Sequence, residues 1–213
     1  MAGSEWVDPA RALRYLGRAD SMPHRTEGEE ALQELVPPDA ARVLDLGTGD
    51  GRLLALVLER RPRTEGVALD FSPTMLAAAR ERFATCRAVN VIEHDLEHRL
   101  PNLGAFTAVV TSFAIHHLEH ERKRSLYAEI LDQLSPGGVF ANLEHVSSPS
   151  PALHRAYLQW MGFTPQDEDP SNRLLDLETQ LGWLRELGYS DVDCLWKWRE
   201  FALLTGTRPP EEP

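Results

Sequence analysis

The sequence predicts an α/β fold in which helices cover both faces of a mostly parallel sheet. Short apolar runs alternate with helical periodicity between residues 42 and 146, which is typical of parallel sheets. A glycine-rich loop joins the first apolar run to a helical pattern, as at the ligand-binding edge of such sheets. Two further apolar runs near the C-terminus are expected to close the sheet.

The strands are expected where the apolar runs are nearly continuous, because a strand covered on both faces has no solvent side. The first five runs are residues 42–46, 66–70, 89–93, 106–112 and 138–146. The closing pair is expected at residues 192–198 and 200–204.

The helices between the strands have readable ends. Ser72 is expected to cap a helix whose first position is Pro73, where the missing N–H costs nothing. The stretch Ser-Pro-Gly-Gly at 135–138 is expected to end another helix and turn the chain into the fifth strand. Further helices are predicted at residues 9–19, 26–36, 151–162 and 177–187, with a polar loop at 164–172.

The chain length of 213 residues predicts one domain. We divide residues 1–213 into a helical cap at 1–36, a ligand-binding core at 42–146, a substrate-side insertion at 147–188 and closing strands at 189–207. No apolar run approaches the roughly 20 residues of a membrane span, and no signal peptide is readable. Two cysteines form no disulfide framework, so we expect a cytoplasmic protein without a membrane partner.

The charge balance favours a small-molecule partner. The formal net charge is -11, whereas nucleic-acid binding draws much of its affinity from a basic surface that contacts phosphates. The composition therefore argues against a nucleic-acid substrate. A monomer and a homodimer both remain open.

The strongest functional signal is the loop after the first predicted strand. Glycines stand at alternate positions, 47, 49 and 51, where the backbone can turn sharply and approach a ligand. Arg52 occupies the position where a dinucleotide site needs a small residue. The acids Asp45 and Asp50 suit a cationic ligand better than a pyrophosphate. Asp70 ends the second strand, where an acid can accept hydrogen bonds from both ribose hydroxyls.

Four segments in order, VLDLGTGDG, ALDFSPTML, His94-Asp95-Leu96 and LSPGGVF, resemble the class I S-adenosylmethionine-dependent methyltransferases. The resemblance covers about residues 42–146. It implies a Rossmann-like, doubly wound sheet of seven strands, whose last hairpin adds an antiparallel strand. The cofactor that it implies is S-adenosylmethionine, and the activity is methyl transfer.

The resemblance also assigns cofactor contacts. The loop residues, Asp45 and Asp50 included, would hold the methionine portion, and Asp70 would hold the ribose. Phe71 and Met75 would pack on adenine, Asp95 would meet its amino group, and Leu96 would lie beside it. Capping or turn formation is the alternative for Asp45, Asp50 and Asp95, and core packing is the alternative for Met75. The full expected set is Asp45, Gly47, Thr48, Gly49, Asp50, Gly51, Asp70, Phe71, Met75, Asp95, Leu96 and Ser112.

The catalytic candidates follow the fourth strand, because the carboxyl ends of central strands face the ligand crevice. His116 and His117 are possible bases, since imidazole titrates near neutrality. Only one of two neighbours is expected to face the ligand, and a structural role is the alternative. Glu144 and His145 end the fifth strand, where one could reach the site. No zinc-type spacing is present, and no metal is predicted.

Residues for the methyl acceptor are expected on the added elements. The candidates are Tyr15, Arg18, His24 and Arg25 before the sheet, and Trp160, Met161, Phe163, Asp167, Asp169 and Asn172 after the fifth strand. Arg25 could instead hold the cofactor carboxylate, and Trp160 and Phe163 could simply pack the insertion onto the sheet. The favoured reaction is methylation of oxygen or nitrogen in a small molecule. The alternatives are RNA modification by methyl or carboxymethyl transfer, and non-catalytic cofactor binding or partnership with an active subunit.

Overall fold

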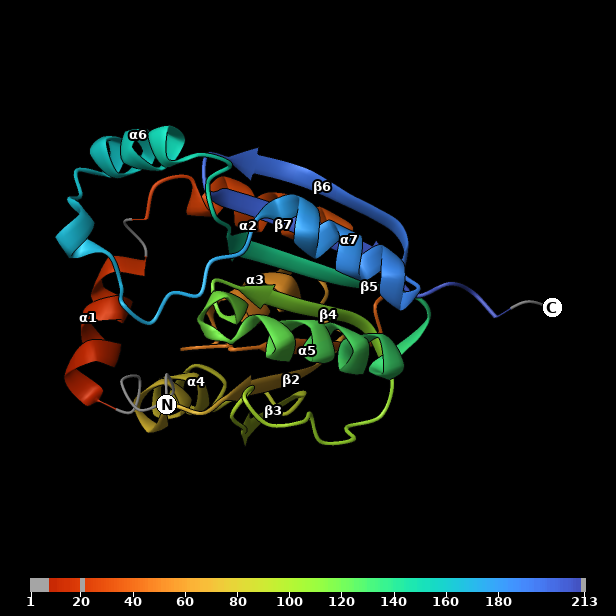
Figure 1. The fold of residues 1–213 in the computed structure, drawn as a ribbon. Helices are drawn as coiled ribbons and strands as arrows, with labels where there is room; N and C mark the ends of the chain where they lie inside the picture. Colours follow the sequence, from red (N-terminus) through yellow and green to blue (C-terminus); the bar gives the residue numbers. More distant parts are fainter. Residues whose placement is uncertain (1–7, 20–21, 212–213) are drawn as a thin grey trace.

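A computed structural model describes residues 8–19 and 22–211. Its strands form one sheet in the order β3-β2-β1-β4-β5-β7-β6 (Figure 1). The strands are β1 (Arg42–Leu46), β2 (Glu65–Asp70), β3 (Val89–Glu93), β4 (Phe106–Ser112), β5 (Leu134–His145), β6 (Ser190–Trp198) and β7 (Phe201–Thr207). The predicted α/β fold with a seven-stranded, mostly parallel sheet is confirmed.

The strand order reverses direction at the middle of the sheet. Strand β1 pairs in parallel with β2 on one side and with β4 on the other, and the order then runs outward to β3 and to β5. Strand β7 pairs antiparallel with β5 and β6. The carboxyl ends of β1 and β4 therefore form the switch point at which open α/β sheets bind ligands.

Helices cover both faces of this sheet (Figure 1). They are α1 (Pro9–Ala19), α2 (Arg25–Leu35), α3 (Arg52–Arg60), α4 (Pro73–Arg82), α5 (His120–Gln133), α6 (Pro151–Met161) and α7 (Leu177–Leu187). Leucines of α2 and α3 join the buried cluster on one face, and Leu126, Ile130 and Leu184 of α5 and α7 join the cluster on the other. None of the described helices is long and apolar enough to cross a membrane.

Several expected element ends differ in the structure. Strand β6 begins at Ser190 rather than at residue 192, and β7 covers Phe201–Thr207 rather than residues 200–204. Strand β5 already begins at Leu134, because that residue pairs with Phe106 before a register shift accommodates residues 135–138. Ser72 stands at the N-cap of α4, but its hydroxyl makes no capping hydrogen bond. The Ser72 amide instead donates to Asp70 Oδ1 over 2.9 Å, so the aspartate at the end of β2 shapes this turn.

The elements outside the sheet gather at one edge of the molecule. Helix α1, the loop after α6 and the short 3₁₀ turn η3 (Pro165–Asp167) lie beyond the strand ends (Figure 1). The predicted cap at residues 1–36 is described only from residue 8 onward, without residues 20–21; residues 1–7 and 20–21 lie outside the described residues.

Candidate functional site

A cavity opens at the carboxyl ends of β1, β2, β3 and β4. Each strand end contributes a short segment to its wall, and helix α2 contributes Arg25. The lining residues are Arg25, Asp45, Gly47, Thr48, Gly49, Asp50, Leu53, Asp70, Phe71, Ser72, Met75, His94, Asp95, Leu96, Glu97, Ser112, Phe113, Ala114, His117 and Leu118. The structure thus brings together all the predicted cofactor residues except Gly51, which starts α3 as its N-cap.

The glycine loop depends on backbone shapes that other residues adopt poorly. All three glycines have positive φ angles, 64° at Gly47, 57° at Gly49 and 82° at Gly51. A Cβ atom at Gly47 would also lie 2.3 Å from the Cβ of Ala114. The Thr48 amide donates to the Leu69 carbonyl over 2.8 Å. Glycine is therefore required at position 47 both for the turn and for the close approach of the β4 end.

Two buried aspartates form the polar floor of the cavity. Asp45 Oδ2 accepts a 2.6 Å hydrogen bond from the Thr48 hydroxyl, and Asp70 Oδ2 accepts one of 2.8 Å from the Gly49 amide. Burial raises the pKa of Asp45 to about 7, against the lowering effect of Thr48. Burial likewise raises the pKa of Asp70, although the Ser72 and Gly49 amides oppose it. A cationic ligand would favour the charged form of both acids.

Asp50 lines the cavity but already has a cationic partner. Its carboxylate forms an ion pair with Arg82 of α4, and its Oδ1 accepts a hydrogen bond from the Arg52 amide over 3.3 Å. Asp50 therefore fastens the loop to α4 and is less suited to a ligand charge than Asp45.

Arg52 has a structural partner that explains its place after the glycines. Its Nε lies 3.1 Å from Glu29 Oε2, and Arg25 Nε donates to Oε1 of the same glutamate over 2.7 Å. Glu29 is buried in α2, so one carboxylate links α2 to the start of α3. No sequence pattern signals this link, because Glu29 looks like any acid on a helix.

The side of the cavity near β2 and β3 is more apolar. Phe71, Met75 and Leu96 all line it, and Met75 and Leu96 are buried. Asp95 lines it too, while its Oδ1 accepts a hydrogen bond from the Glu97 amide over 3.0 Å. Asp95 thus combines the two roles that the sequence left open: it caps the following turn and stands in the wall.

Several buried polar atoms in the wall lack a hydrogen-bond partner among the described residues. They are Ser72 Oγ, His94 Nε2 and Ser112 Oγ. Buried polar atoms are normally hydrogen-bonded, and exceptions are frequent where a ligand or water completes the site. The chemistry of the wall, with acids, orphaned polar atoms and an apolar side, fits S-adenosylmethionine.

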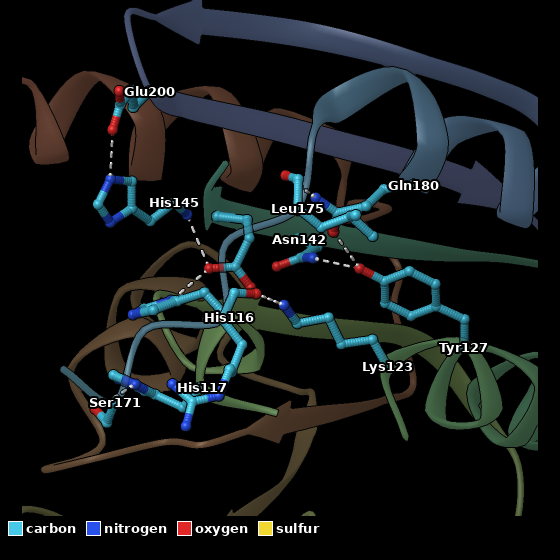
Figure 2. A network of polar contacts seen from close by, with 12 residues as sticks. His116, His117, Lys123, Tyr127, Asn142, His145, Ser171, Leu175, Gln180 and Glu200 are labelled. Carbon is cyan, nitrogen blue, oxygen red and sulfur yellow. Dashed lines mark hydrogen bonds and ion pairs between the residues drawn. The ribbon is translucent and has the colours of Figure 1, made fainter. Parts of the chain in front are cut away.

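The adjacent histidines face different surroundings, as expected. His117 lines the cavity, and its Nδ1 lies 3.0 Å from Ser171 Oγ. His116 is turned away, with its Nδ1 2.6 Å from Glu144 Oε1 (Figure 2). The two rings lie 4.0 Å apart between centroids. Burial lowers the pKa of His117 to about 3 and that of His116 well below its usual value. Both rings are therefore neutral at pH 7.

Neither member of the Glu144–His145 pair lines the cavity. Glu144 accepts from the His145 amide over 2.8 Å besides its contact with His116. The His145 ring turns to the opposite side, where its Nε2 lies 3.0 Å from Glu200 Oε2 (Figure 2). Neither residue therefore meets the suggestion that one of the two could reach the ligand: Glu144 contacts His116, whose ring lies against that of His117.

The N-terminal helix and the insertion meet above the cavity. Arg11 Nη2 donates to Asp169 over 2.6 Å and 2.7 Å, and Ser171 joins this pair to His117. Trp160 packs partly on the sheet, as one of the two alternatives held: it contacts Trp198, the last residue of β6, edge to face, with centroids 4.4 Å apart. Trp160 and Phe163 nevertheless stay 46% and 41% exposed.

The remaining acceptor candidates do not reach the described cavity, apart from Arg25. His24 stacks on Trp198, and Asp167 closes the capping box of η3 with Thr164. Met161 packs against the buried cluster, and Asn172 is half-buried outside the wall. The side chains of Tyr15 and Arg18 lie outside the described residues.

Some lining residues were missed by sequence reasoning. Leu53, His94 and Glu97 line the cavity beside the predicted set, whereas Phe113, Ala114 and Leu118 belong to the segment after the fourth strand that was expected to face the crevice. Phe113 is unusual, because its φ angle is 54° and the Arg25 guanidinium lies 5.7 Å from its ring centre. Strained backbone of this kind clusters at functional sites, but no sequence signal marks a phenylalanine for it. Within the described residues, no group of three His, Cys, Asp or Glu side chains is placed to hold a metal.

Comparisons with known proteins agree with this geometry. Residues 43–138 match the model of a family described as a methyltransferase domain. The chain is 38% identical over 124 residues to the demethylmenaquinone methyltransferase of Thermus thermophilus, covering 55% of this chain and 54% of that protein. It is 29% identical over 156 residues to the trans-aconitate 2-methyltransferase of an Acidovorax species, covering 71% of this chain and 55% of that protein.

The chain spans about half the length of these curated relatives. Among solved structures, it resembles an O-methyltransferase family protein from Burkholderia thailandensis with a TM-score of 0.78 and 23% identity. That likeness covers 98% of this chain and 63% of the other. At this identity the likeness shows the fold.

Proposed function

We propose that the chain is a class I S-adenosylmethionine-dependent methyltransferase, and that it transfers the methyl group of S-adenosylmethionine to an oxygen or nitrogen atom of a small molecule. The observation that carries this proposal is a single cavity in which the glycine loop lies between Asp45 and Asp70. This arrangement suits a ligand with both a cationic and a hydroxyl-bearing part.

S-adenosylmethionine, when bound, supplies a methyl group on a positively charged sulfur. Asp45 and the glycine loop would hold the charged amino-acid portion, and Asp70 would accept hydrogen bonds from the ribose hydroxyls. Phe71, Met75 and Leu96 offer apolar contact for the adenine ring, with Asp95 at its amino group. The orphaned hydroxyls of Ser72 and Ser112 would gain partners.

The acceptor is expected on the side of the cavity formed by the end of β4. His117, Phe113 and Arg25 line that side, and a neutral His117 can take the proton that a hydroxyl or ammonium group loses. We propose that the segments 1–36 and 147–188 supply the acceptor side, because Arg11 and Asp169 join them there. We also propose that residues 1–213 act as one domain.

Two findings support a small-molecule acceptor. The names of the relatives refer to demethylmenaquinone and trans-aconitate, which are both small molecules. The net charge of -11 opposes binding to a nucleic-acid backbone. Methyl transfer also depends strongly on holding the acceptor close and in line, for which a walled cavity is suited.

The test is calorimetric titration with S-adenosylmethionine, S-adenosylhomocysteine and NADH. Both adenosyl ligands should bind, and Asp70→Ala should weaken them at least thirtyfold, about 2 kcal/mol for lost charge-assisted hydrogen bonds. Glu93→Ala is the matched control, because Glu93 ends the neighbouring strand opposite Asp70 and is exposed. Binding of NADH alone, or equal losses in both variants, would refute the cofactor assignment.

Transfer itself is measured with a radiolabelled methyl group and a panel of phenols, carboxylic acids and amines, with RNA as a separate arm. Label in a small molecule supports the proposal. Label in RNA alone, or tight binding without transfer to any acceptor, would replace it with RNA modification or with non-catalytic binding.

A further inference from the structure

Arg11, Asp169 and Ser171 form a hydrogen-bonded group that reaches the ring of His117 through Ser171. Ser171 Oγ lies 3.0 Å from His117 Nδ1 (Figure 2), and the same hydroxyl donates to Asp169 Oδ1 over 2.7 Å. Arg11 of α1 donates through Nη2 to that Asp169 carboxylate and, over 3.2 Å, to Ser171 Oγ. This group, Arg11–Asp169–Ser171, lies between the N-terminal helix and the insertion.

The hydrogen bonds around Ser171 determine which atom donates. A hydroxyl carries one proton, and an ionised carboxylate has none to give. Asp169 stays ionised: burial would raise its pKa, but the hydrogen bonds from Ser171 and Arg11 outweigh burial and lower it. The Ser171 proton therefore goes to Asp169, and the contact between Ser171 and His117 requires that His117 Nδ1 carries a proton.

The protonation of one ring nitrogen decides the role of the other. The His117 ring is neutral, because burial and neighbouring His116 lower its pKa to about 3, against the raising effects of Asp169 and Glu144. A neutral imidazole has one N–H and one lone pair. With the proton on Nδ1, the lone pair lies on Nε2, in a ring that lines the cavity.

We propose that Ser171 and Asp169 are positioning residues that hold His117 in its Nδ1–H tautomer, so that Nε2 receives the proton lost by the methyl acceptor. The transfer of the acceptor's proton to His117 rests on the proposed function. As that proton binds Nε2, the ring becomes an imidazolium whose Nδ1–H still donates to Ser171, and Ser171 in turn donates to Asp169. The ring later returns the proton to solvent.

The segment that carries Ser171 is fixed well enough for this role. The Arg173 amide donates to the His116 carbonyl over 2.8 Å, and Arg173 Nε donates to Glu119 over 3.0 Å. Lys123 Nζ donates to the Arg173 carbonyl (Figure 2). These contacts hold residues 171–173 against the turn that follows β4, so Ser171 keeps a constant place relative to His117.

The test is nitrogen-15 NMR of protein labelled in histidine, with His117→Gln to assign the signal of His117. The wild-type ring should be neutral and protonated at Nδ1. Ser171→Ala should make the Nε2–H form the major one, because Nδ1 then loses its acceptor, while Ser171→Thr should keep the wild-type form. Thr164→Ala is the matched control, since Thr164 makes a similar 2.7 Å hydrogen bond to Asp167 in the same insertion.

An Nε2–H ring in the wild-type protein, or a tautomer unchanged by Ser171→Ala, would overturn the inference. The readout needs neither cofactor nor acceptor. Its failure is therefore distinguishable from a failure of the proposed function, which the cofactor titration measures separately.

Discussion

Two glutamates, Glu144 and Glu200, are both 1% exposed, one beside the candidate site and one at the closing hairpin. Glu200 precedes β7 and accepts hydrogen bonds from His145, Ser148 and His154. Those donors outweigh burial and lower its pKa. Glu144 accepts through Oε1 alone, and its Oε2 has no partner among the described residues. Burial therefore raises the pKa of Glu144 to about 7, although Lys123 opposes it.

The difference shows that the number of donors, rather than burial, decides whether a buried carboxylate stabilises the fold. The hairpin carboxylate joins β5, the following loop and α6, because His145, Ser148 and His154 belong to these three segments. Beside the candidate site, Glu144 leaves Oε2 without a donor among the described residues, and burial raises the pKa of Asp45 and Asp70 in the cavity despite the donors that they have. A region that must bind a ligand keeps polar groups unsatisfied, at a cost in stability.

The largest expected effect is on the hairpin glutamate. Glu200→Gln should lower the free energy of unfolding by about 2–4 kcal/mol at pH 8, because an amide cannot accept from all three donors. Glu144→Gln should cost less than about 1 kcal/mol, since Gln keeps one acceptor and removes a buried charge. Urea unfolding of both variants at pH 8 measures the comparison.

The stability that Glu200 contributes should also depend on pH. A lowered folded-state pKa means that Glu200 contributes stability above its unfolded value near 4.5, and the contribution disappears as the pH falls below that value. The difference between wild type and Glu200→Gln should therefore shrink in acid. Equal losses in the two variants at pH 8 would contradict the comparison.

The next largest effect should have the opposite sign. Asp45→Asn should raise the free energy of unfolding of the ligand-free protein by about 1–3 kcal/mol at pH 8, because it removes a carboxylate that burial disfavours in its charged form. The folded-state pKa of about 7 lies above the unfolded value of 3.8. The penalty is thus absent below the unfolded value, grows up to pH 7 and is constant above it.

Thermal unfolding from pH 4 to pH 8 measures this effect. Asp193→Asn is a suitable control, because Asp193 is an exposed acid of β6 outside the cavity. A variant that is less stable than wild type at pH 8 would show that the Asp45 carboxylate is already satisfied by Thr48.

The smallest expected effect is on cofactor affinity. S-adenosylmethionine should bind more tightly as the pH rises through 7, by at most about tenfold per unit, because binding a cation requires the charged form of Asp45. Proton release is measured by calorimetry in buffers of different ionisation enthalpy. Asp45→Asn should abolish most of the release, and a wild-type affinity independent of pH would show that Asp45 meets no cationic group.

The sequence was sufficient for the features that are written within a few neighbouring residues. The alternation of apolar runs located β1 to β4 within one residue, and three glycines identified the loop at β1. Asp45, Asp70 and Asp95 were found because they stand at or just beyond the ends of strands, and parallel strands end at the same edge of a sheet. The capping hydrogen bond expected from the Ser72 hydroxyl was not predicted correctly, because the Asp70 carboxylate is the acceptor in this turn.

The sequence by itself therefore determined the fold and most of the cavity wall, because hydrophobic periodicity and glycine turns act over short separations. Only the tertiary structure decided the pairings of charged and polar groups. Arg52 with Glu29, Arg11 with Asp169, and Ser171 with His117 are separated by 23, 158 and 54 residues. A hydrogen bond requires contact within about 3 Å, and contact at such separations exists only once the sheet has brought those segments together.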